Sequence, residues 1–242
     1  MSEITKLIVE GKGKRLYATE NPEEAVVYYR DETFAFHGLK RGRIIGKGEI
    51  NNLICEYIFS LLTEKGVPNH FIQRIDERCS LVKRVEILPF EVKVRNIAAG
   101  SLAQRLNIPE GTRLKNTVLE YCLKDSDQDN PLINLTHITA MDMATAEEVR
   151  QIDEICLKVN RILSEYMSEI SIELIDFKLE FGRFHGEILL ADEISPDTCR
   201  FWDARTHEPL DLDRFRKDLG NVEEAYRDVL HRMSGNRLRD GE

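Results

Sequence analysis

Alternating apolar and polar positions predict β-strands over much of the first part of the chain. Residues 7–19 read as two strands joined by a glycine turn, and residues 25–30 read as a third strand that follows turn-forming residues. Further strand candidates occupy residues 70–75, 80–88 and 89–95. The pattern therefore predicts a sheet-rich N-terminal region.

Apolar residues at helical spacing are concentrated in other segments. Residues 48–64 have one apolar helical face, and Gly66 follows them as a C-terminal cap. Residues 101–106 predict a short helix, and residues 144–170 contain a long amphipathic helix with a capping box at its start. The C-terminal segment predicts two helices separated near Gly220.

The order of these elements indicates the fold class. Strands come first and helices later, without a regular alternation of strand, helix and strand, which predicts an α+β protein with mostly antiparallel sheets. We expect two domains, an N-terminal sheet domain of residues 1–85 and a larger α+β domain of residues 86–242.

The strand LIDFKLEFG (residues 174–182) has two faces of different character. With a period of two, the apolar side chains of Ile175, Phe177, Leu179 and Phe181 share one face. The other face carries Asp176, Lys178 and Glu180 together with Leu174. This charged face is either solvent-exposed, where cross-strand pairs contribute roughly 0.2–1 kcal/mol each, or it is the polar floor of a cleft that binds a metal and an anionic substrate.

Composition and charge exclude several classes of protein. The chain has 242 residues, 42% hydrophobic and 32% charged, as in ordinary globular proteins. Its net charge of −9 disfavours partners such as nucleic acids or anionic membranes. No apolar run approaches the roughly 20 residues of a membrane span, and the first residues lack the apolar region of a signal peptide. We expect a cytoplasmic protein with neither kind of partner.

The cysteines and histidines argue against a soft metal. Five cysteines are scattered without a C-x-x-C pair, and six histidines are dispersed without an H-E-x-x-H motif. A bound metal is therefore expected to be a hard cation held by oxygen atoms.

Two stretches have features of anion-binding sites. In EGKGK, Lys12 and Lys14 flank Gly13 at a bend where they can cover a polyphosphate, although an ordinary basic hairpin has the same pattern. In PFEVKVRNIAAGS, a strand delivers Arg95 beside Ser101, which can cap a helix. The pair suits phosphate or carboxylate, and the alternative is an ordinary helix cap with a surface arginine.

A third stretch collects acids at the end of an apolar strand. EILLADEISPDTCRFWD contains Asp192 at the strand end and Arg200 beyond it. If this strand pairs with residues 174–182, Glu180 and Asp192 face one cleft, and two carboxylates suit Mg²⁺. The alternative is a strand end whose acids are solvated by water. The loop GRIIGKG (residues 42–48) is one spacer short of a phosphate-binding P-loop and lacks its Ser/Thr, so we interpret it as a basic loop that precedes a helix.

These stretches together resemble the SAICAR synthetase family, the phosphoribosylaminoimidazole-succinocarboxamide synthases. LPFEVKVRNIAAGS and LIDFKLEFG are similar to two signature segments of the family, and EGKGK, GKGEINN and LADEISPDTCRFWD are similar to further blocks in the same order. The resemblance covers the chain from Leu7 to about Gly235.

The resemblance implies a reaction and an architecture. The family joins carboxyaminoimidazole ribotide (CAIR) to L-aspartate with ATP and Mg²⁺, in a cleft between two domains, and its bacterial members suggest a homodimer. It implies ATP-binding residues Lys12, Gly13, Lys14, Val82, Lys83, Glu180 and Asp192. Of these, Glu180 and Asp192 are the implied Mg²⁺ ligands. It implies ribotide-binding residues Arg95, Ser101, Arg200, Asp176 and Lys178.

The charged face of the strand at residues 174–182 then acquires a catalytic interpretation. A carboxylate must be activated before an amine can displace its oxygen, and ATP can do this by forming an acyl phosphate, so that positioning and charge neutralisation dominate. The resemblance implies that Glu180 holds the metal, that Lys178 draws the anionic groups together and that Asp176 orients the ribotide.

Three positions depart from the family pattern: His37, Ser126 and Asn130.

Two other classes of function also share the basic hairpin and the acids. A phosphotransferase would use a stable phosphate acceptor, but its H-R-D-type loop is absent from the sequence. A nucleotide sensor would bind ATP without turnover, but it gives no reason for a second anion site at Arg95.

Overall fold

The computed structural model describes residues 4–35, 38–125, 128 and 130–240. Within them, the first sheet has the strand order β1-β2-β3-β7-β6, and every neighbouring pair is antiparallel. Its strands are β1 (Ile4–Glu10), β2 (Lys14–Thr19), β3 (Glu24–Tyr29), β6 (Phe71–Arg74) and β7 (Cys79–Lys83). A separate two-stranded sheet pairs β4 (Glu32–Ala35) with β5 (Lys40–Arg43).

The second large sheet is also antiparallel and has the order β10-β9-β8-β11-β12, with β13 paired to the other end of β11. Its strands are β8 (Glu86–Ile97), β9 (Arg113–Leu123), β10 (Leu132–Ile133), β11 (Ile172–Phe184), β12 (Glu187–Ala191) and β13 (Cys199–Asp203). The sequence-based prediction of an α+β fold with mostly antiparallel sheets is therefore confirmed.

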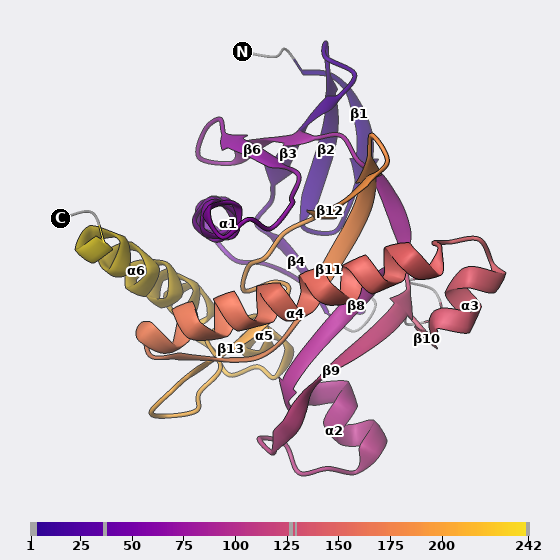
Figure 1. Cartoon of the computed structure of the whole chain (residues 1–242). Coiled ribbons are helices and arrows are strands. Elements are labelled where there is room, and N and C mark those ends of the chain that lie inside the picture. The colour runs from indigo at the N-terminus through magenta and orange to yellow at the C-terminus, as the bar shows by residue number, and fades with distance from the viewer. Residues whose placement is uncertain (1–3, 36–37, 126–127, 129, 241–242) are drawn as a thin grey trace.

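The helices pack around these two sheets (Figure 1). They are α1 (Lys47–Glu64), α2 (Gly100–Leu106), α3 (Leu135–Ala140), α4 (Ala146–Glu169), α5 (Asp213–Arg216) and α6 (Val222–Asp240). The long helix α4 lies across β8 and β11, and α1 packs against β3, β6 and α6. The predicted capping box of α4 is present, because Thr145 and Glu148 exchange side-chain and backbone hydrogen bonds.

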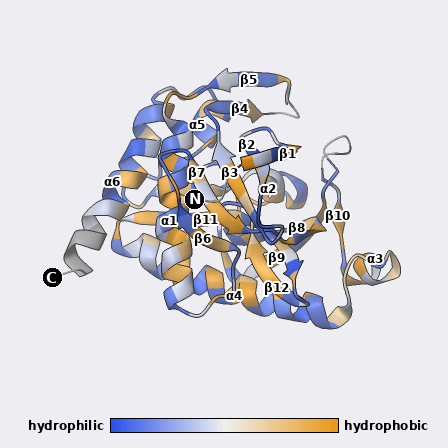
Figure 2. Ribbon diagram, turned by 90° about the horizontal axis from the view of Figure 1, so that it is seen from above, coloured by the Kyte–Doolittle hydropathy of each residue, from blue (hydrophilic) through white to orange (hydrophobic). Residues whose placement is uncertain are grey.

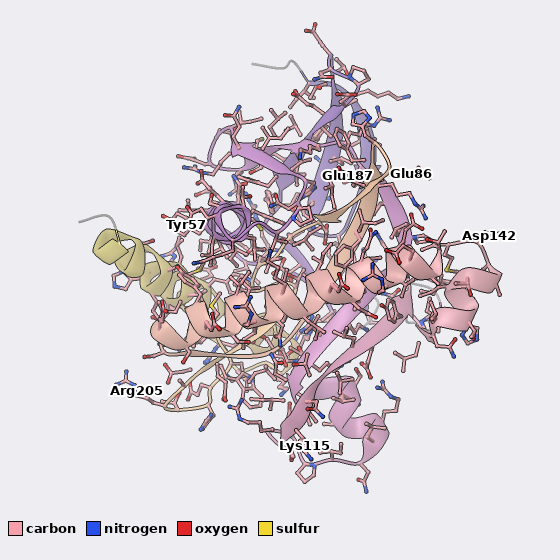
Figure 3. All side chains as sticks on the ribbon, viewed as in Figure 1. Tyr57, Glu86, Lys115, Asp142, Glu187 and Arg205 are labelled. Carbon is pink, nitrogen blue, oxygen red and sulfur yellow. The ribbon has the colours of Figure 1, made fainter. Side chains whose placement is uncertain are left out.

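The apolar side chains form one large core that joins both sheets. The core runs from Ala25 in β3 through Ile54 and Ile58 in α1 to Phe177 in β11 and Val159 in α4. Figure 2 shows hydrophobic positions along β3, β8 and β9 in the middle of the molecule and a mostly hydrophilic β5 at its edge. Side chains fill the space between helices and strands, while the labelled Lys115 and Arg205 point outward (Figure 3).

The change from the first sheet to the second falls between β7, which ends at Lys83, and β8, which starts at Glu86. This position coincides with the boundary expected between residues 85 and 86. Because the core is continuous across it, the division into two domains stays a prediction. No helix formed by the described residues combines the length and apolar composition needed to cross a bilayer.

Two local expectations are wrong. The strands expected over residues 80–88 and 89–95 are divided at another place: β7 ends at Lys83, and β8 runs from Glu86 through Pro89 to Ile97. Its pairing with β11 is irregular between Glu180 and Gly182, and this irregularity accommodates a residue without an N–H group. The second wrong expectation is that Ile175 shares one apolar face with Phe177. The pairing of β11 with β13 shifts between Leu174 and Asp176, so Leu174 joins the main core and Ile175 lies in a separate small apolar cluster.

Candidate active site

A pocket of about 700 Å³ is lined by residues of both large sheets. Its apolar part comes from the first sheet, the connection between β7 and β8, and the start of β8: Ile8, Leu16, Ala25, Val27, Val82, Val85 and Ile87. Its polar part comes from the β1–β2 hairpin, α1, β11 and the segments after β9 and β12: Lys12, Lys14, Lys47, Lys124, Lys178, Glu180, Asp192, Glu193 and Asp197. An apolar slot beside a dense set of charges is suited to a nucleotide, which has a flat base and a polyphosphate.

The β1–β2 hairpin places its lysines over the polar part. The Gly11 amide donates to the Lys14 carbonyl oxygen at 2.8 Å, and the Arg30 amide donates to the Gly13 carbonyl oxygen at 2.9 Å, so the bend is fixed by backbone hydrogen bonds. The Lys14 ammonium forms ion pairs with Asp192 and, at 3.0 Å, with Glu193. Burial alone would lower the pKa of Lys14, but these two carboxylates outweigh burial and raise that pKa, so the lysine is charged.

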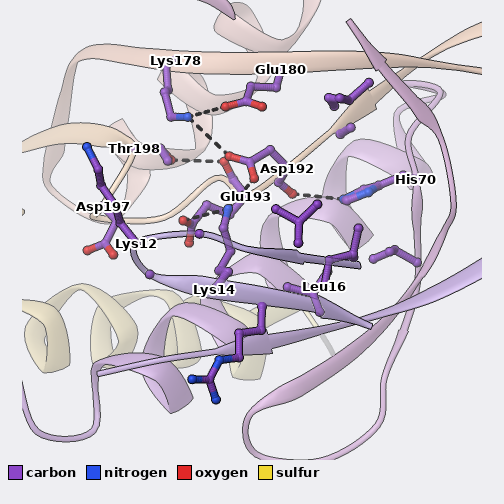
Figure 4. Close-up of a pocket in the computed structure, with 18 of the residues that line it drawn as sticks. Lys12, Lys14, Leu16, His70, Lys178, Glu180, Asp192, Glu193, Asp197 and Thr198 are labelled. Carbon is purple, nitrogen blue, oxygen red and sulfur yellow. Dashed lines mark hydrogen bonds and ion pairs between the residues drawn. The ribbon is translucent and has the colours of Figure 1, made fainter. Parts of the chain in front are cut away.

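The central group of the site consists of three carboxylates and two ammonium groups. We call it the acid–lysine cluster: Lys14, Glu91, Lys178, Glu180 and Asp192. The Lys178 ammonium lies 2.5 Å from Glu180 Oε1, 3.4 Å from Asp192 Oδ2 and 3.6 Å from Glu91 Oε2. Figure 4 shows Lys178, Glu180, Asp192 and Glu193 gathered opposite the hairpin, with Lys14 reaching toward the acids. The charges on one face of β11 thus converge with Glu91 of β8 and with Asp192, which follows β12.

Burial and neighbouring charges both shift pKa values in this cluster. Burial would lower the pKa of Lys178, but Glu180 and Asp192 raise it well above its usual value. Burial would raise the pKa of Asp192, but the Lys14 and Lys178 ammonium groups lower it strongly. Lys178 and Asp192 are therefore both ionised at neutral pH. The solvent-exposed interpretation of the strand is wrong, because Asp176 and Glu180 are buried.

The carboxylates of the acid–lysine cluster fit a hard cation. Mg²⁺ usually takes one or two carboxylates and completes its shell with phosphate and water oxygens, and Glu180 and Asp192 offer two carboxylates within reach of one ammonium group. The described residues contain no group of three or more His, Cys, Asp or Glu side chains arranged as a metal site.

Of the five residues expected to bind the ribotide, Lys178 lines the pocket, and the other four form a second cluster outside its lining. Arg95 Nη1 donates to Asp176 at 2.8 Å, Arg95 Nη2 donates to Ser101 Oγ at 3.1 Å, and Arg200 Nη1 donates to both Asp176 oxygens at 3.0 and 2.8 Å. The structure therefore brings Arg95, Ser101, Asp176 and Arg200 together. They lie beside the pocket, because Asp176 is two residues from Lys178 on the same strand.

Two expectations about this second cluster are wrong. Arg95 is not a surface arginine, since it is 2% exposed and also donates to Glu120. Ser101 is not the helix cap, because α2 is preceded by Ala99 without a side-chain cap, and the Ser101 hydroxyl accepts from Arg95 instead.

Sequence reasoning missed a buried ion pair beside Gly13 of the hairpin. Lys47, in the loop interpreted only as basic, is 1% exposed, and its ammonium lies 2.6 Å from Asp197. The Tyr226 hydroxyl of α6 donates to the other Asp197 oxygen at 2.6 Å. Burial would raise the pKa of Asp197, but Lys47 lowers it. A signal was available, since Lys47 stands between two glycines in a segment similar to a family block.

Three further pocket residues were also missed: His70, Lys124 and Glu193. His70 is buried, and burial lowers its pKa to about 4, so its ring is neutral. Lys124 pairs with Glu180. Burial is the largest influence on Glu193 and raises its pKa although Lys14 is near.

Of the three departures from the family pattern, His37 and Ser126 lie outside the described residues. Asn130 has a φ of 46°, in the left-handed region that Asn tolerates. The side-chain amide nitrogen of Asn130 lies 3.5 Å from Glu91 Oε1, at the margin of hydrogen bonding, so this position adjoins the acid–lysine cluster.

Comparison with known proteins decides the family. The SAICAR synthetase family model matches residues 7–233. The chain belongs to the SAICAR synthetase family. A relative named phosphoribosylaminoimidazole-succinocarboxamide synthase, from Clostridium novyi (strain NT), is 52% identical over 229 residues, which are 95% of this chain and 97% of the relative.

Solved SAICAR synthetases have the same fold. The phosphoribosylaminoimidazole-succinocarboxamide synthase from Ehrlichia chaffeensis aligns with a TM-score of 0.93 at 42% identity, covering 95% of this chain and 98% of that one. A SAICAR synthetase (Type-2) solved in complex with ADP aligns with a TM-score of 0.92 at 41% identity and the same coverage.

Proposed function

We propose that this chain is an ATP-dependent ligase that joins CAIR and L-aspartate to form SAICAR, ADP and phosphate, a step of de novo purine biosynthesis. The observation that carries the proposal is the match to the SAICAR synthetase family over residues 7–233. The pocket supports it, because an apolar slot adjoins lysines and carboxylates of the kind that ATP requires.

In this proposal the nucleotide lies along the first sheet. Its base occupies the apolar part beside Val82 and Lys83, which line the pocket at the end of β7. The phosphates lie under the hairpin formed by Lys12, Gly13 and Lys14. Since Gly13 has no side chain, its backbone can approach a phosphate closely, and Lys14 remains charged beside its two acids.

Glu180 and Asp192 would hold Mg²⁺ in this arrangement. The bound ion would neutralise phosphate charge during transfer. Lys178 contacts both acids, so its ammonium can hold the CAIR carboxylate next to the phosphate that activates it. Asp176, two positions along the strand, orients the ribotide, and the reaction then depends on placement more than on covalent catalysis by the protein.

The second cluster supplies the ribotide phosphate site of the proposal. Arg95, Ser101 and Arg200 lie around Asp176, with two guanidinium groups on one carboxylate. Two guanidinium groups and a hydroxyl suit a phosphate. We further propose a homodimer located in the cytoplasm, as the resemblance to bacterial family members leads us to expect.

The proposed reaction predicts strict coupling of its products. Incubation with ATP, Mg²⁺, CAIR and L-aspartate should yield amide, ADP and phosphate in a ratio of one to one to one. Without aspartate, phosphate release should be slow, because a closed site protects an acyl phosphate from water. The amide can be followed by chromatography, and ADP and phosphate by coupled assays.

The same experiment separates the rival functions. A phosphotransferase would form a stable phosphorylated acceptor at a rate independent of aspartate, and a nucleotide sensor would bind ATP and form no ADP. Either result, or ATP turnover without an amide, contradicts the proposed ligase.

A conservative change in the second cluster should affect one substrate only. Arg95→Lys keeps a positive charge but loses the forked donor geometry that reaches Asp176 and Ser101. We expect the KM for CAIR to rise about tenfold, the scale of one charged hydrogen bond, with little change in the KM for ATP. Arg113→Lys is the control, since the side chain of Arg113 is 69% exposed. A rise confined to the KM for ATP would instead assign Arg95 to the nucleotide.

A further inference from the structure

Asp192 has an unusual backbone conformation for a residue so close to the chemistry. Its φ is 62°, in the left-handed region that non-glycine residues rarely adopt. Such a conformation is unfavourable by about 1 kcal/mol or more and persists where the surroundings hold it. The residue follows β12 directly, so its conformation decides where its carboxylate points after the strand ends.

The surroundings hold the backbone of Asp192 and its neighbour from two sides. His70 Nε2 lies 3.0 Å from the Asp192 carbonyl oxygen (Figure 4). Because a carbonyl oxygen only accepts, Nε2 carries the hydrogen of this bond. On the other side, the Thr198 hydroxyl donates to the carbonyl oxygen of Glu193 at 3.2 Å.

His70 is itself fixed in place. Its amide donates to the Leu190 carbonyl oxygen at 2.9 Å, and its carbonyl oxygen accepts from the Lys83 amide at 2.7 Å. Its ring packs against Phe59, with 5.4 Å between ring centroids, and the residue is 6% exposed. The backbone of His70 is therefore anchored to β12 and to the end of β7, and its ring is packed against α1.

We propose that His70 is a positioning residue, which holds Asp192 in its left-handed conformation and thereby directs its carboxylate at the metal-nucleotide site. This inference rests on the proposed function, because it takes Asp192 as a Mg²⁺ ligand. With the backbone held, the Asp192 carboxylate reaches both Lys14 and Lys178. The hydrogen bond from the Lys83 amide to the His70 carbonyl oxygen also connects His70 to β7, the strand proposed to lie beside the base.

The test compares two substitutions at His70 by a binding measurement. His70→Gln can place an amide donor close to the position of Nε2, whereas His70→Phe keeps an apolar ring against Phe59 and removes the donor. The affinity for ADP is measured by calorimetry in Mg²⁺ and in EDTA. We expect Mg²⁺ to raise the affinity for ADP about tenfold less in His70→Phe than in the wild type, the scale for partners that orient metal ligands. The affinity for ADP measured in EDTA should be unchanged. His70→Gln should retain most of the gain.

Other outcomes would overturn the inference. A Mg²⁺ gain of wild-type size in His70→Phe, or a loss of equal size in EDTA and Mg²⁺, would mean that His70 only fills space. If His70→Phe fails to fold, His70→Asn replaces it, because its shorter side chain cannot reach the Asp192 carbonyl. Failure of the proposed function is a separate result: wild-type protein would form no amide, while the Mg²⁺-dependent difference between variants would still be measurable.

Discussion

Asp192→Asn and Glu180→Gln should each fold normally and lose turnover by about 100-fold or more at limiting Mg²⁺, a scale typical of removing one preorganised charge or donor from an active site. Each substitution keeps the size of the side chain and removes one negative charge that opposes the ATP phosphates. Folding should persist because the lysines keep other partners: Lys14 retains Glu193, and Lys178 retains Glu91.

The measurement is turnover as a function of Mg²⁺ concentration, with the thermal unfolding midpoint as a check on folding. Glu187→Gln is the matched control, since this glutamate is exposed at the start of β12, the strand that Asp192 directly follows. Near-normal activity of both variants at limiting Mg²⁺ would contradict the metal assignment, even if amide formation is confirmed.

Replacing two helical glycines with alanine should change stability in opposite directions. Gly48 lies in the first turn of α1, where an added Cβ would be 2.5 Å from the Tyr29 carbonyl oxygen and 2.6 Å from Arg78 Nη1. A backbone oxygen cannot move aside like a side chain, so Gly48→Ala must push α1 away from β3. We expect a loss of about 1–3 kcal/mol in the free energy of unfolding, as for other overpacked sites.

Gly235 is the matched control, because it is exposed in α6 and an added Cβ would meet nothing within 4 Å. Gly235→Ala should stabilise the protein by up to about 1 kcal/mol, the difference in helix propensity. Urea unfolding measures both values. If Gly48→Ala is as stable as wild type, the close approach of α1 and β3 does not limit stability.

Local patterns in the sequence were sufficient to predict most of the elements. Helix α1 begins one residue before the range expected from its apolar spacing, and the capping box of α4 is present. These features depend on residues within one or two turns of each other, so a short window contains the information. The two wrong local predictions, a strand boundary at Pro89 and the side-chain direction of Ile175, both concern irregularities in the pairing of β11. There the partner strand changes the alternation of side chains between the two faces.

The partners within the site could not be predicted in the same way. Lys14 and Asp192 are separated by 178 positions, and Lys47 and Asp197 by 150. A short window shows that a lysine follows a glycine, but not which acid neutralises it after folding. Lys47 was therefore interpreted as part of a basic loop, and His70 as one position of a strand, although both line the pocket. The resemblance to the family supplied residue types, while the contacts needed the fold.

The contact between Tyr226 and Asp197 has a consequence for how the protein is made. Lys14 and Lys47 are synthesised early, but the acids that neutralise them come from the segment after β12, and the hydroxyl that holds Asp197 comes from α6. Contacts of such long sequence separation form late, because a large loop must close first. On the ribosome, the first sheet can therefore emerge with its lysines unpaired, and the contacts of Asp197 are complete only after Tyr226 in α6 has left the exit tunnel.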